Sequence, residues 1–243
     1  MHGKKGLFLM FSLGSKYHAL DTKLCALRAT LIKDFENIKG DLLLKYRESP
    51  TSITQEFHKL SKYIYDKPIR DFVKELVYGY ANSDIAHYLS LWKGLQRLDK
   101  PTQTSMRKII GTEADMLNII FIYRLKRYYH VRGDTAYGYL LPIGYRLTTD
   151  EIDRLLSAKK EAFLSEVLNG SYGDIFKNMD FPERVMSQFM LLLYKKESRN
   201  SSIVALCSYL YEKHLEIRNI KAIYEGLRYK LPHNEILSSL LYS

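Results

Sequence analysis

The spacing of apolar residues constrains this chain more than any other feature, because they recur at steps of three or four along most of its length. The longest run lies near the end and draws one stripe along one long helix. Its mainly apolar positions are Ile203, Leu206, Cys207, Leu210, His214, Ile217, Ile220, Tyr224 and Leu227. Val, Ile and Thr never alternate with polar residues for long, so the sequence predicts no strand. We therefore expect an all-α fold.

Helix-start signals divide the periodic sequence into separate helices. Two capping boxes and two helix-initiating prolines are expected, at Ser52 with Gln55, at Thr148 with Glu151, at Pro68 and at Pro182. Asn82–Ser83 precedes another apolar stripe, and Asn200–Ser202 supplies a turn and cap before the long last helix. Residues 116–125 are apolar on nearly all sides, so that helix should be buried on most of its surface.

An internal repeat relates residues 115–129 to residues 216–230, at an offset of 101. The shared pattern is acid-x-x-Asn-Ile-x-x-Ile-Tyr-x-x-x-Arg-Tyr. Its members pair as Asp115 with Glu216, Asn118 with Asn219, Ile119 with Ile220, Ile122 with Ile223, Tyr123 with Tyr224, Arg127 with Arg228 and Tyr128 with Tyr229. The alternative, two helices of merely similar composition, does not explain why the asparagines stay in register. We expect both asparagine side chains to be buried and hydrogen-bonded, and the helices over 113–129 and 202–230 to be equivalent elements.

The net positive charge and the N-terminal segment do not by themselves identify the partner or the compartment of this chain. Lys and Arg exceed Asp and Glu by 37 to 27, which suggests an acidic partner, yet no nucleic-acid-binding motif and no basic run of five is present. Residues 1–16 combine a basic start with a short apolar stretch, which fits either a signal peptide or, more simply, a leader or disordered N-terminus. Cys25 and Cys207 lie on apolar stripes and are interpreted as small core residues.

The sequence shows no arrangement typical of catalysis or of cofactor binding. It contains no phosphate-binding glycine loop, no His-Glu-x-x-His and no cysteine pair, so we expect no cofactor and no metal. His214 lies on the last apolar stripe and is interpreted as a core histidine. Glu113 and Asp115 are interpreted as caps or solvated turns rather than as an acid/base pair.

Five segments, in order, resemble one family of rotary-ATPase subunits, called d in V-type ATPases and C in archaeal and bacterial V/A-type ATP synthases. The resemblance covers about residues 17–243. Its segments are the first helix from Tyr17 to Arg28, the repeat helix from Glu113 to Arg124, Leu140–Leu147 (LLPIGYRL), Leu168–Gly173 (LNGSYG) and Glu212–Ile220 (EKHLEIRNI). This chain departs from the family in a short stretch between Ile38 and Ser52, so it resembles a shortened member, and Arg124 is replaced by Glu225 in the second copy of the repeat.

The resemblance implies a non-catalytic subunit at the cytoplasmic face of the membrane. Such a subunit is a funnel-like bundle of pseudo-repeated helical modules that links the central shaft of a rotary ATPase to the membrane proteolipid ring for proton or sodium transport. It implies no nucleic acid, no small-molecule substrate and membrane contact only through the ring. The domains expected are a leader over 1–16, a first and shortened helical module over 17–138 and a second over 139–243. The alternative is a helical scaffold of unrelated function.

The expected contact surface is basic. A stalk-to-ring adaptor needs one surface for a helical shaft and one for the loops of the ring. Arg124, Lys126, Arg127 and Arg228 are the residues expected to face an acidic partner. The alternative is that these long side chains only lie over the protein's own helices.

Overall fold

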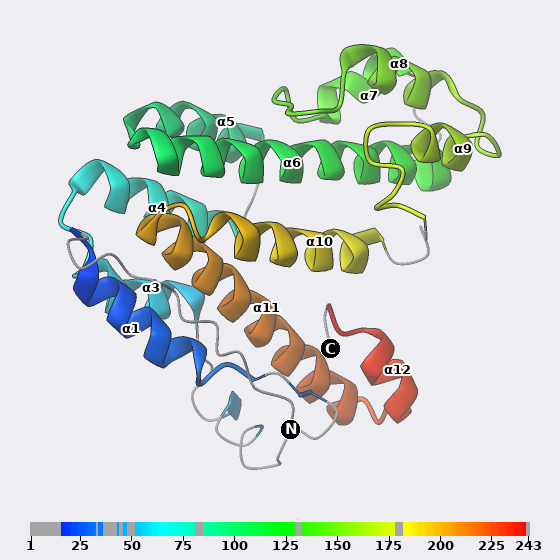
Figure 1. The fold of residues 1–243 in the computed structure, drawn as a ribbon. Coiled ribbons are helices and arrows are strands. Elements are labelled where there is room, and N and C mark those ends of the chain that lie inside the picture. The colour runs from blue at the N-terminus through cyan, green and yellow to red at the C-terminus, as the bar shows by residue number, and fades with distance from the viewer. Residues whose placement is uncertain are drawn as a thin grey trace, which may run out of the picture.

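The computed structural model describes residues 16–32, 34–35, 43, 46–47, 52–80, 85–129, 133–177 and 182–241, and these form an all-α protein without a strand (Figure 1). The expectation of an all-α fold is therefore confirmed. Residues 1–15 of the expected leader, the cap at Asn82–Ser83 and most of the stretch between Ile38 and Ser52 lie outside the described residues. No helix of the described part is long and apolar enough to cross a membrane.

The helices follow one another in a single order along the chain. They are α1 (His18–Arg28), α3 (Ile53–Ser61), α4 (Lys67–Gly79), α5 (Ile85–Gly94) with the 3-10 turn η1 (Leu95–Arg97), α6 (Lys100–Arg124) with the π-helical turn η2 (Leu125–Tyr129), α7 (Gly133–Ala136) with the 3-10 turn η3 (Tyr137–Tyr139), α8 (Thr149–Ser157), α9 (Phe163–Leu168), α10 (Pro182–Glu197), α11 (Ser202–Arg228) and α12 (His233–Ser238).

Local sequence signals start these helices where they were expected. The Ser52–Gln55 and Thr148–Glu151 capping boxes are both formed, at the starts of α3 and α8. Pro68 lies in the first turn of α4 and Pro182 is the first residue of α10, as expected, whereas Pro101, in the first turn of α6, was not among the expected helix starts. Ser201 caps α11, where its hydroxyl accepts the N–H of Ile203. Each cap satisfies backbone donors that a helix leaves unpaired at its N-terminus.

Two long helices, α6 and α11, organise the packing (Figure 1). Helix α10 contacts both of them, α5 packs on α6, and α1 and α3 pack on α11. Their apolar faces merge into one core that includes Leu24, Ile109, Tyr194 and Leu210. A smaller apolar cluster joins the last turns of α11 to α12 and to Phe35. The main core spans both sequence ranges, 17–138 and 139–243, so the division into two modules stays a prediction.

Helix α1 is fixed to α11 although the two are far apart in sequence. The Ser202 hydroxyl donates to the Asp21 carboxylate at 2.9 Å, and the Arg28 guanidinium donates to the Ala205 carbonyl at 3.1 Å. Cys25 faces outward from this contact and is exposed. The interpretation of Cys25 as a core residue is wrong because it lies on the solvent side of α1, whereas the second cysteine, on α11, is buried as expected.

Candidate functional site

The acid of the first repeat copy lies at the centre of a buried network rather than in a solvated turn. Asp115 has no exposed surface, and its carboxylate accepts the backbone N–H groups of Tyr145, Arg146 and Leu147 at 2.7 to 3.2 Å. The Tyr172 hydroxyl donates to the same carboxylate at 2.7 Å. Burial and this carboxylate raise the pKa of Tyr172 well above its ordinary value. The interpretation of Asp115 as a cap or solvated turn is therefore wrong: it fastens the segment after η3 to α6.

The asparagine one turn further along α6 holds the start of the same segment. Asn118 is 1% exposed, its amide oxygen accepts the N–H of Leu141 at 2.8 Å, and its amide nitrogen donates to the Leu141 carbonyl at 3.0 Å. We call residues 140–147 the connector. Because both polar groups of Leu141 are paired with one side chain, the connector is fixed in position and register.

The second copy of the repeat reproduces the asparagine contact. Asn219 is also 1% exposed, and its amide oxygen accepts the N–H of Leu241 at 2.9 Å. Leu141 and Leu241 each end a Leu-Leu pair that follows a short helix, η3 in one case and α12 in the other. Both asparagines are therefore buried and bonded to backbone, as expected, whereas the equivalence of the two helices as elements of related modules stays a prediction.

The two acids of the repeat are satisfied differently. Glu216 is 3% exposed, and the Lys213 ammonium, one turn earlier on the same helix, donates to its Oε1 at 2.8 Å. Burial raises the pKa of Glu216, and Lys213 opposes that rise only in part. The acid in this copy therefore pairs with a cation of its own helix and has a backbone hydrogen bond with Ile32, whereas Asp115 holds the segment 145–147.

The tyrosines of the repeat are only partly buried and make ring contacts. The Tyr123 ring lies 5.9 Å from the Phe163 ring, and the Tyr224 ring lies 6.2 Å from the Tyr46 ring. Each pair ties a repeat helix to a different segment: α9 in the first copy and the region before α3 in the second.

Two of the four basic residues expected at a partner surface bind within the chain. Arg124 pairs with Glu183 at the start of α10. The Lys126 ammonium donates to the carbonyls of Leu156 and Ala158, both at 2.6 Å, and so caps the C-terminal end of α8. Partial burial lowers the pKa of Lys126.

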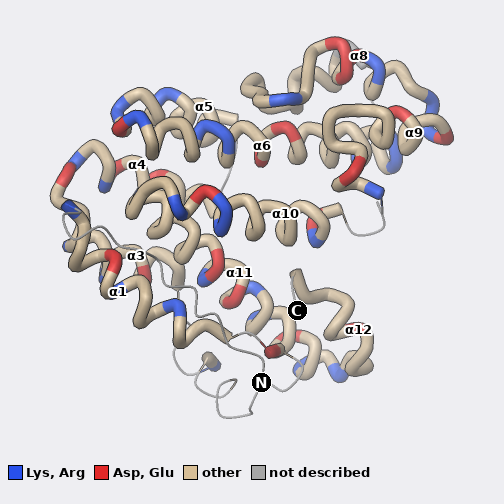
Figure 2. Tube along the Cα trace, viewed as in Figure 1, with Lys and Arg blue, Asp and Glu red and all other residues tan. Residues whose placement is uncertain are grey.

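The other two basic residues occupy equivalent exposed positions at the ends of the long helices. Arg127 lies over the rings of Tyr123 and Tyr128 and donates to the Tyr123 hydroxyl at 2.7 Å. Arg228 lies over the Tyr229 ring at 5.8 Å. Elsewhere acidic and basic residues are interspersed along the helices rather than gathered on one face (Figure 2).

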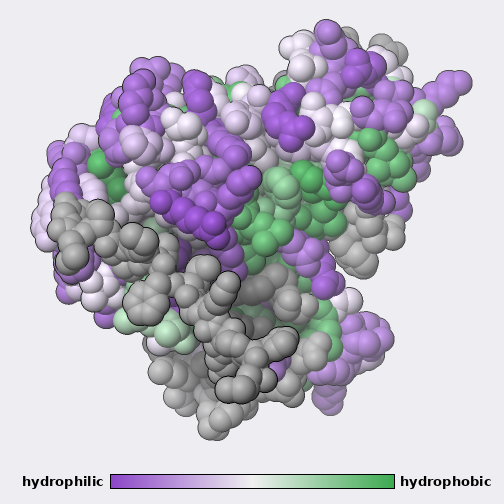
Figure 3. All heavy atoms as spheres, viewed as in Figure 1, coloured by the Kyte–Doolittle hydropathy of each residue, from purple (hydrophilic) through white to green (hydrophobic). Residues whose placement is uncertain are grey.

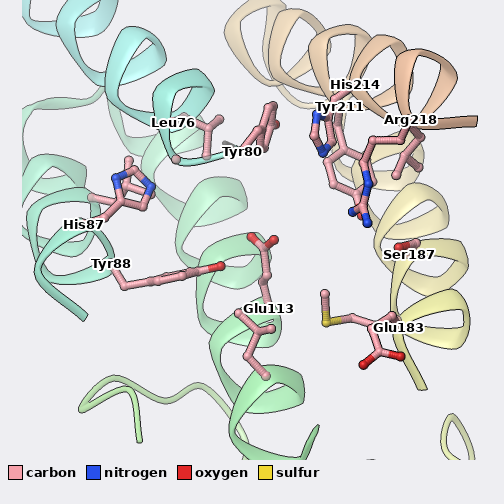
Figure 4. A pocket seen from close by; sticks show the side chains of 15 residues that line it. Leu76, Tyr80, His87, Tyr88, Glu113, Glu183, Ser187, Tyr211, His214 and Arg218 are labelled. Carbon is pink, nitrogen blue, oxygen red and sulfur yellow. The ribbon is translucent and has the colours of Figure 1, made fainter. Parts of the chain in front are cut away.

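A polar cavity, absent from the sequence-based expectations, lies where α6 and α11 meet α4, α5 and α10. Its volume is about 220 Å³. Figure 4 shows Glu113 of α6 and Arg218 of α11 pointing into it. Glu113 and His214 both line it, and they are 101 residues apart, the offset of the repeat. That coincidence is a sequence signal that could have pointed to this place, but the repeat pattern begins only at Asp115 and Glu216.

The environment of the cavity changes the protonation of its side chains. Burial raises the pKa of Glu113 to about 7, and a hydrogen bond with Tyr88 only partly opposes this. Burial, with the nearby Arg218, lowers the pKa of His214 to about 4. Glu113 is therefore a half-buried acid in mid-helix whose carboxyl is shielded from water, which corrects its interpretation as a solvated cap. His214, stacked 4.7 Å from the Tyr80 ring, is a half-buried neutral histidine, in line with the core interpretation.

The geometry therefore defines an all-α protein in which buried side chains of two long helices, α6 and α11, hold the segments that follow η3 and α12. No group of three potential metal ligands occurs in the described part of the chain. A protein-family comparison matches residues 8–239 to the family described as ATP synthase (C/AC39) subunit. The chain belongs to that family, and so is a subunit of the V/A-type ATP synthase class. A search of curated proteins found no match.

Proposed function

We propose that this protein is the non-catalytic central-stalk subunit that couples the rotating shaft of a V/A-type ATP synthase to the proteolipid ring in the membrane. The family match over residues 8–239 carries the proposal. The protein acts at the cytoplasmic face, touches the membrane through the ring, and contributes to proton or sodium transport by transmitting torque.

The fastening of the connector supports a mechanical role. A torque-bearing adaptor must deform little, and a buried carboxylate that accepts three consecutive backbone N–H groups joins the connector to α6 by charge-assisted hydrogen bonds. Asn118 adds two more bonds to Leu141 nearby. Side chains buried in this way are unavailable for substrate, which agrees with a structural rather than chemical use of the repeat motif.

We assign the contact with the ring to the exposed ends of the two long helices, at Arg127–Tyr128 and Arg228–Tyr229. Tyr128 and Tyr229 are 62% and 68% exposed, and each lies beside an arginine. Exposed aromatic and arginine side chains are enriched at protein interfaces. Two equivalent ends on one chain suit a partner built of identical subunits, because each end meets the same loop.

We assign the contact with the shaft to an apolar stripe on α10. Val185, Phe189 and Leu192 follow one another at helical spacing; the first two are half-buried and Leu192 is 66% exposed. Figure 3 shows apolar residues gathered over α10, between hydrophilic surfaces. An amphipathic helix of the shaft would bury this stripe along its own apolar face.

A reconstitution experiment tests the coupling role. The complex assembled without this subunit should still hydrolyse ATP in its soluble head but should not transport ions into vesicles, and adding the purified subunit should restore transport. Co-purification of the tagged subunit with both head and ring is the accompanying check. Unchanged ion transport in its absence would refute the proposal.

A charge-reversal experiment tests the assigned ring contact. The double variant Arg127→Glu/Arg228→Glu should slow assembly of head with ring, most strongly at low salt, because exposed charges mainly set association rates. Arg97→Glu/Arg199→Glu makes the same charge change at exposed positions elsewhere and should assemble at the parental rate. Arg124 is left intact because reversing it would break its pair within the chain. Equal rates for both double variants would contradict the assignment.

A further inference from the structure

One positive charge lies at the rim of the cavity between α6 and α11, and no described residue neutralises it. Arg218 is exposed at the rim of this cavity, makes no ion pair among the residues that the structure describes, and points its guanidinium into the cavity (Figure 4). Two other ionisable groups that face this space are already engaged: Glu183 with Arg124, and His87 with Glu75 at 3.3 Å. An unpaired guanidinium beside a polar cavity is a ready site for an anion.

Neutral hydrogen-bonding groups surround this charge from the adjoining helices. Ser187 of α10 and Tyr211 of α11 lie beside it. Tyr88 of α5 points toward Glu113, and Tyr80, which follows the last residue of α4, stacks on the ring of His214. Hydroxyl groups serve equally as donors and acceptors, so they can turn toward an anion without a change of charge. The cavity therefore offers one cation and several donors.

The carboxyl group of Glu113 carries no charge below about pH 7, so it does not repel an anion there. Below about pH 7 the Glu113 carboxyl is protonated, because burial raises its pKa to about 7, and it then presents an O–H donor. His214 stays neutral down to about pH 4, where its lowered pKa lies. The Tyr80, Tyr88 and Tyr211 hydroxyls, whose pKa values burial raises, stay protonated throughout.

We propose that the cavity binds a small oxyanion of the sulfate, phosphate or carboxylate class, with Arg218 as its counter-charge and with Ser187 and protonated Glu113 as donors. A volume of about 220 Å³ has room for such an ion together with water, since one water molecule needs only about 10–15 Å³. The site lies between α6 and α11, so a bound anion would link the two repeat helices. This inference does not depend on the coupling role.

Calorimetric titration of the purified protein with sodium sulfate tests the site, because sulfate keeps its charge over the whole pH range used. Saturable one-site binding is expected at about pH 6. Since the protonated fraction of Glu113 falls from about 0.9 to about 0.1 between pH 6 and pH 8, the affinity should fall about tenfold. Displacement of sulfate by phosphate or by acetate then identifies which oxyanion class the site prefers.

Three variants make the test specific. Arg218→Gln should weaken sulfate binding tenfold or more, whereas Arg199→Gln, the same change at an exposed position away from the cavity, should bind as the parent does. Glu113→Gln should bind with the same affinity at both pH values. Sulfate should also raise the melting temperature of the parent and of Arg199→Gln but not of Arg218→Gln. No saturable binding at pH 6, or equal losses in the two arginine variants, would overturn the inference.

Discussion

Replacing Asn118 by leucine removes the two hydrogen bonds that hold the connector at Leu141. The N–H and the carbonyl of Leu141 then stay buried without a partner, and each stranded group costs about 1–3 kcal/mol. The leucine side chain recovers part of this by burying more apolar surface. We therefore expect the free energy of unfolding to fall by about 2–4 kcal/mol.

Urea unfolding followed by circular dichroism measures this loss, and thermal unfolding should show a melting temperature lower by roughly 5–15 °C for a chain of this size. Amide hydrogen exchange at Leu141 should accelerate. The matched control is Asn169→Leu, at an exposed asparagine at the end of α9, which should change stability little. If Asn118→Leu melts at or above the parent temperature, the two bonds to Leu141 do not stabilise the fold and the reasoning fails.

Three further predictions concern an acid, a lysine and the two cysteines. The pKa of Glu113 is about 7 in the folded state against an ordinary 4.5. Its contribution to stability is therefore fully present below about pH 4.5 and is lost as the pH rises through 7. Between about pH 5 and pH 8 the free energy of unfolding of the parent, measured with urea, should fall by up to about 3 kcal/mol relative to that of Glu113→Gln. Lys126→Met keeps the aliphatic chain but uncaps α8, and should lower the unfolding free energy by about 1–2 kcal/mol in the same assay, whereas Lys177→Met, at an exposed lysine, should not. In the native protein a maleimide should modify exposed Cys25 but spare Cys207, whose thiol pKa burial raises to about 12; peptide mass spectrometry showing early labelling of Cys207 would contradict this.

Local features of the fold could be predicted from the sequence because neighbouring residues determine them. The capping boxes at Ser52 and Thr148 need only a partner three residues away. Pro182 favours the first position of a helix because its ring fixes φ at a helical value. The burial of Asn118 and Asn219 was also predictable, since an amide amid Ile and Tyr on two repeated helices implies a common internal contact.

Features that depend on distant segments could not be predicted. In the sequence Asp115 resembles a solvated acid, because the backbone N–H groups that bind its carboxylate belong to connector residues 30 to 32 positions further on. In the sequence Arg124 and Lys126 resemble part of a basic surface, because their partners lie on distant segments: Glu183 of α10 for Arg124 and the end of α8 for Lys126. Cys25 has apolar neighbours in sequence, and only the direction from which α11 packs on α1 decides that it faces solvent. The family resemblance supplied the overall class but none of these contacts.

The contact between α1 and α11 sets the order in which the chain can fold during its synthesis. Asp21 and Ser202 are 181 residues apart, so the apolar face of α1 has no partner on α11 until most of the chain has left the ribosome. At about 5–20 residues per second this interval is roughly 10–40 s. Throughout it Leu20 and Leu24, buried in the finished protein, lack that cover and can meet other nascent chains and chaperones. The first of these helices to be made is thus among the last to find its place, and any truncation before α11 would leave this face permanently uncovered.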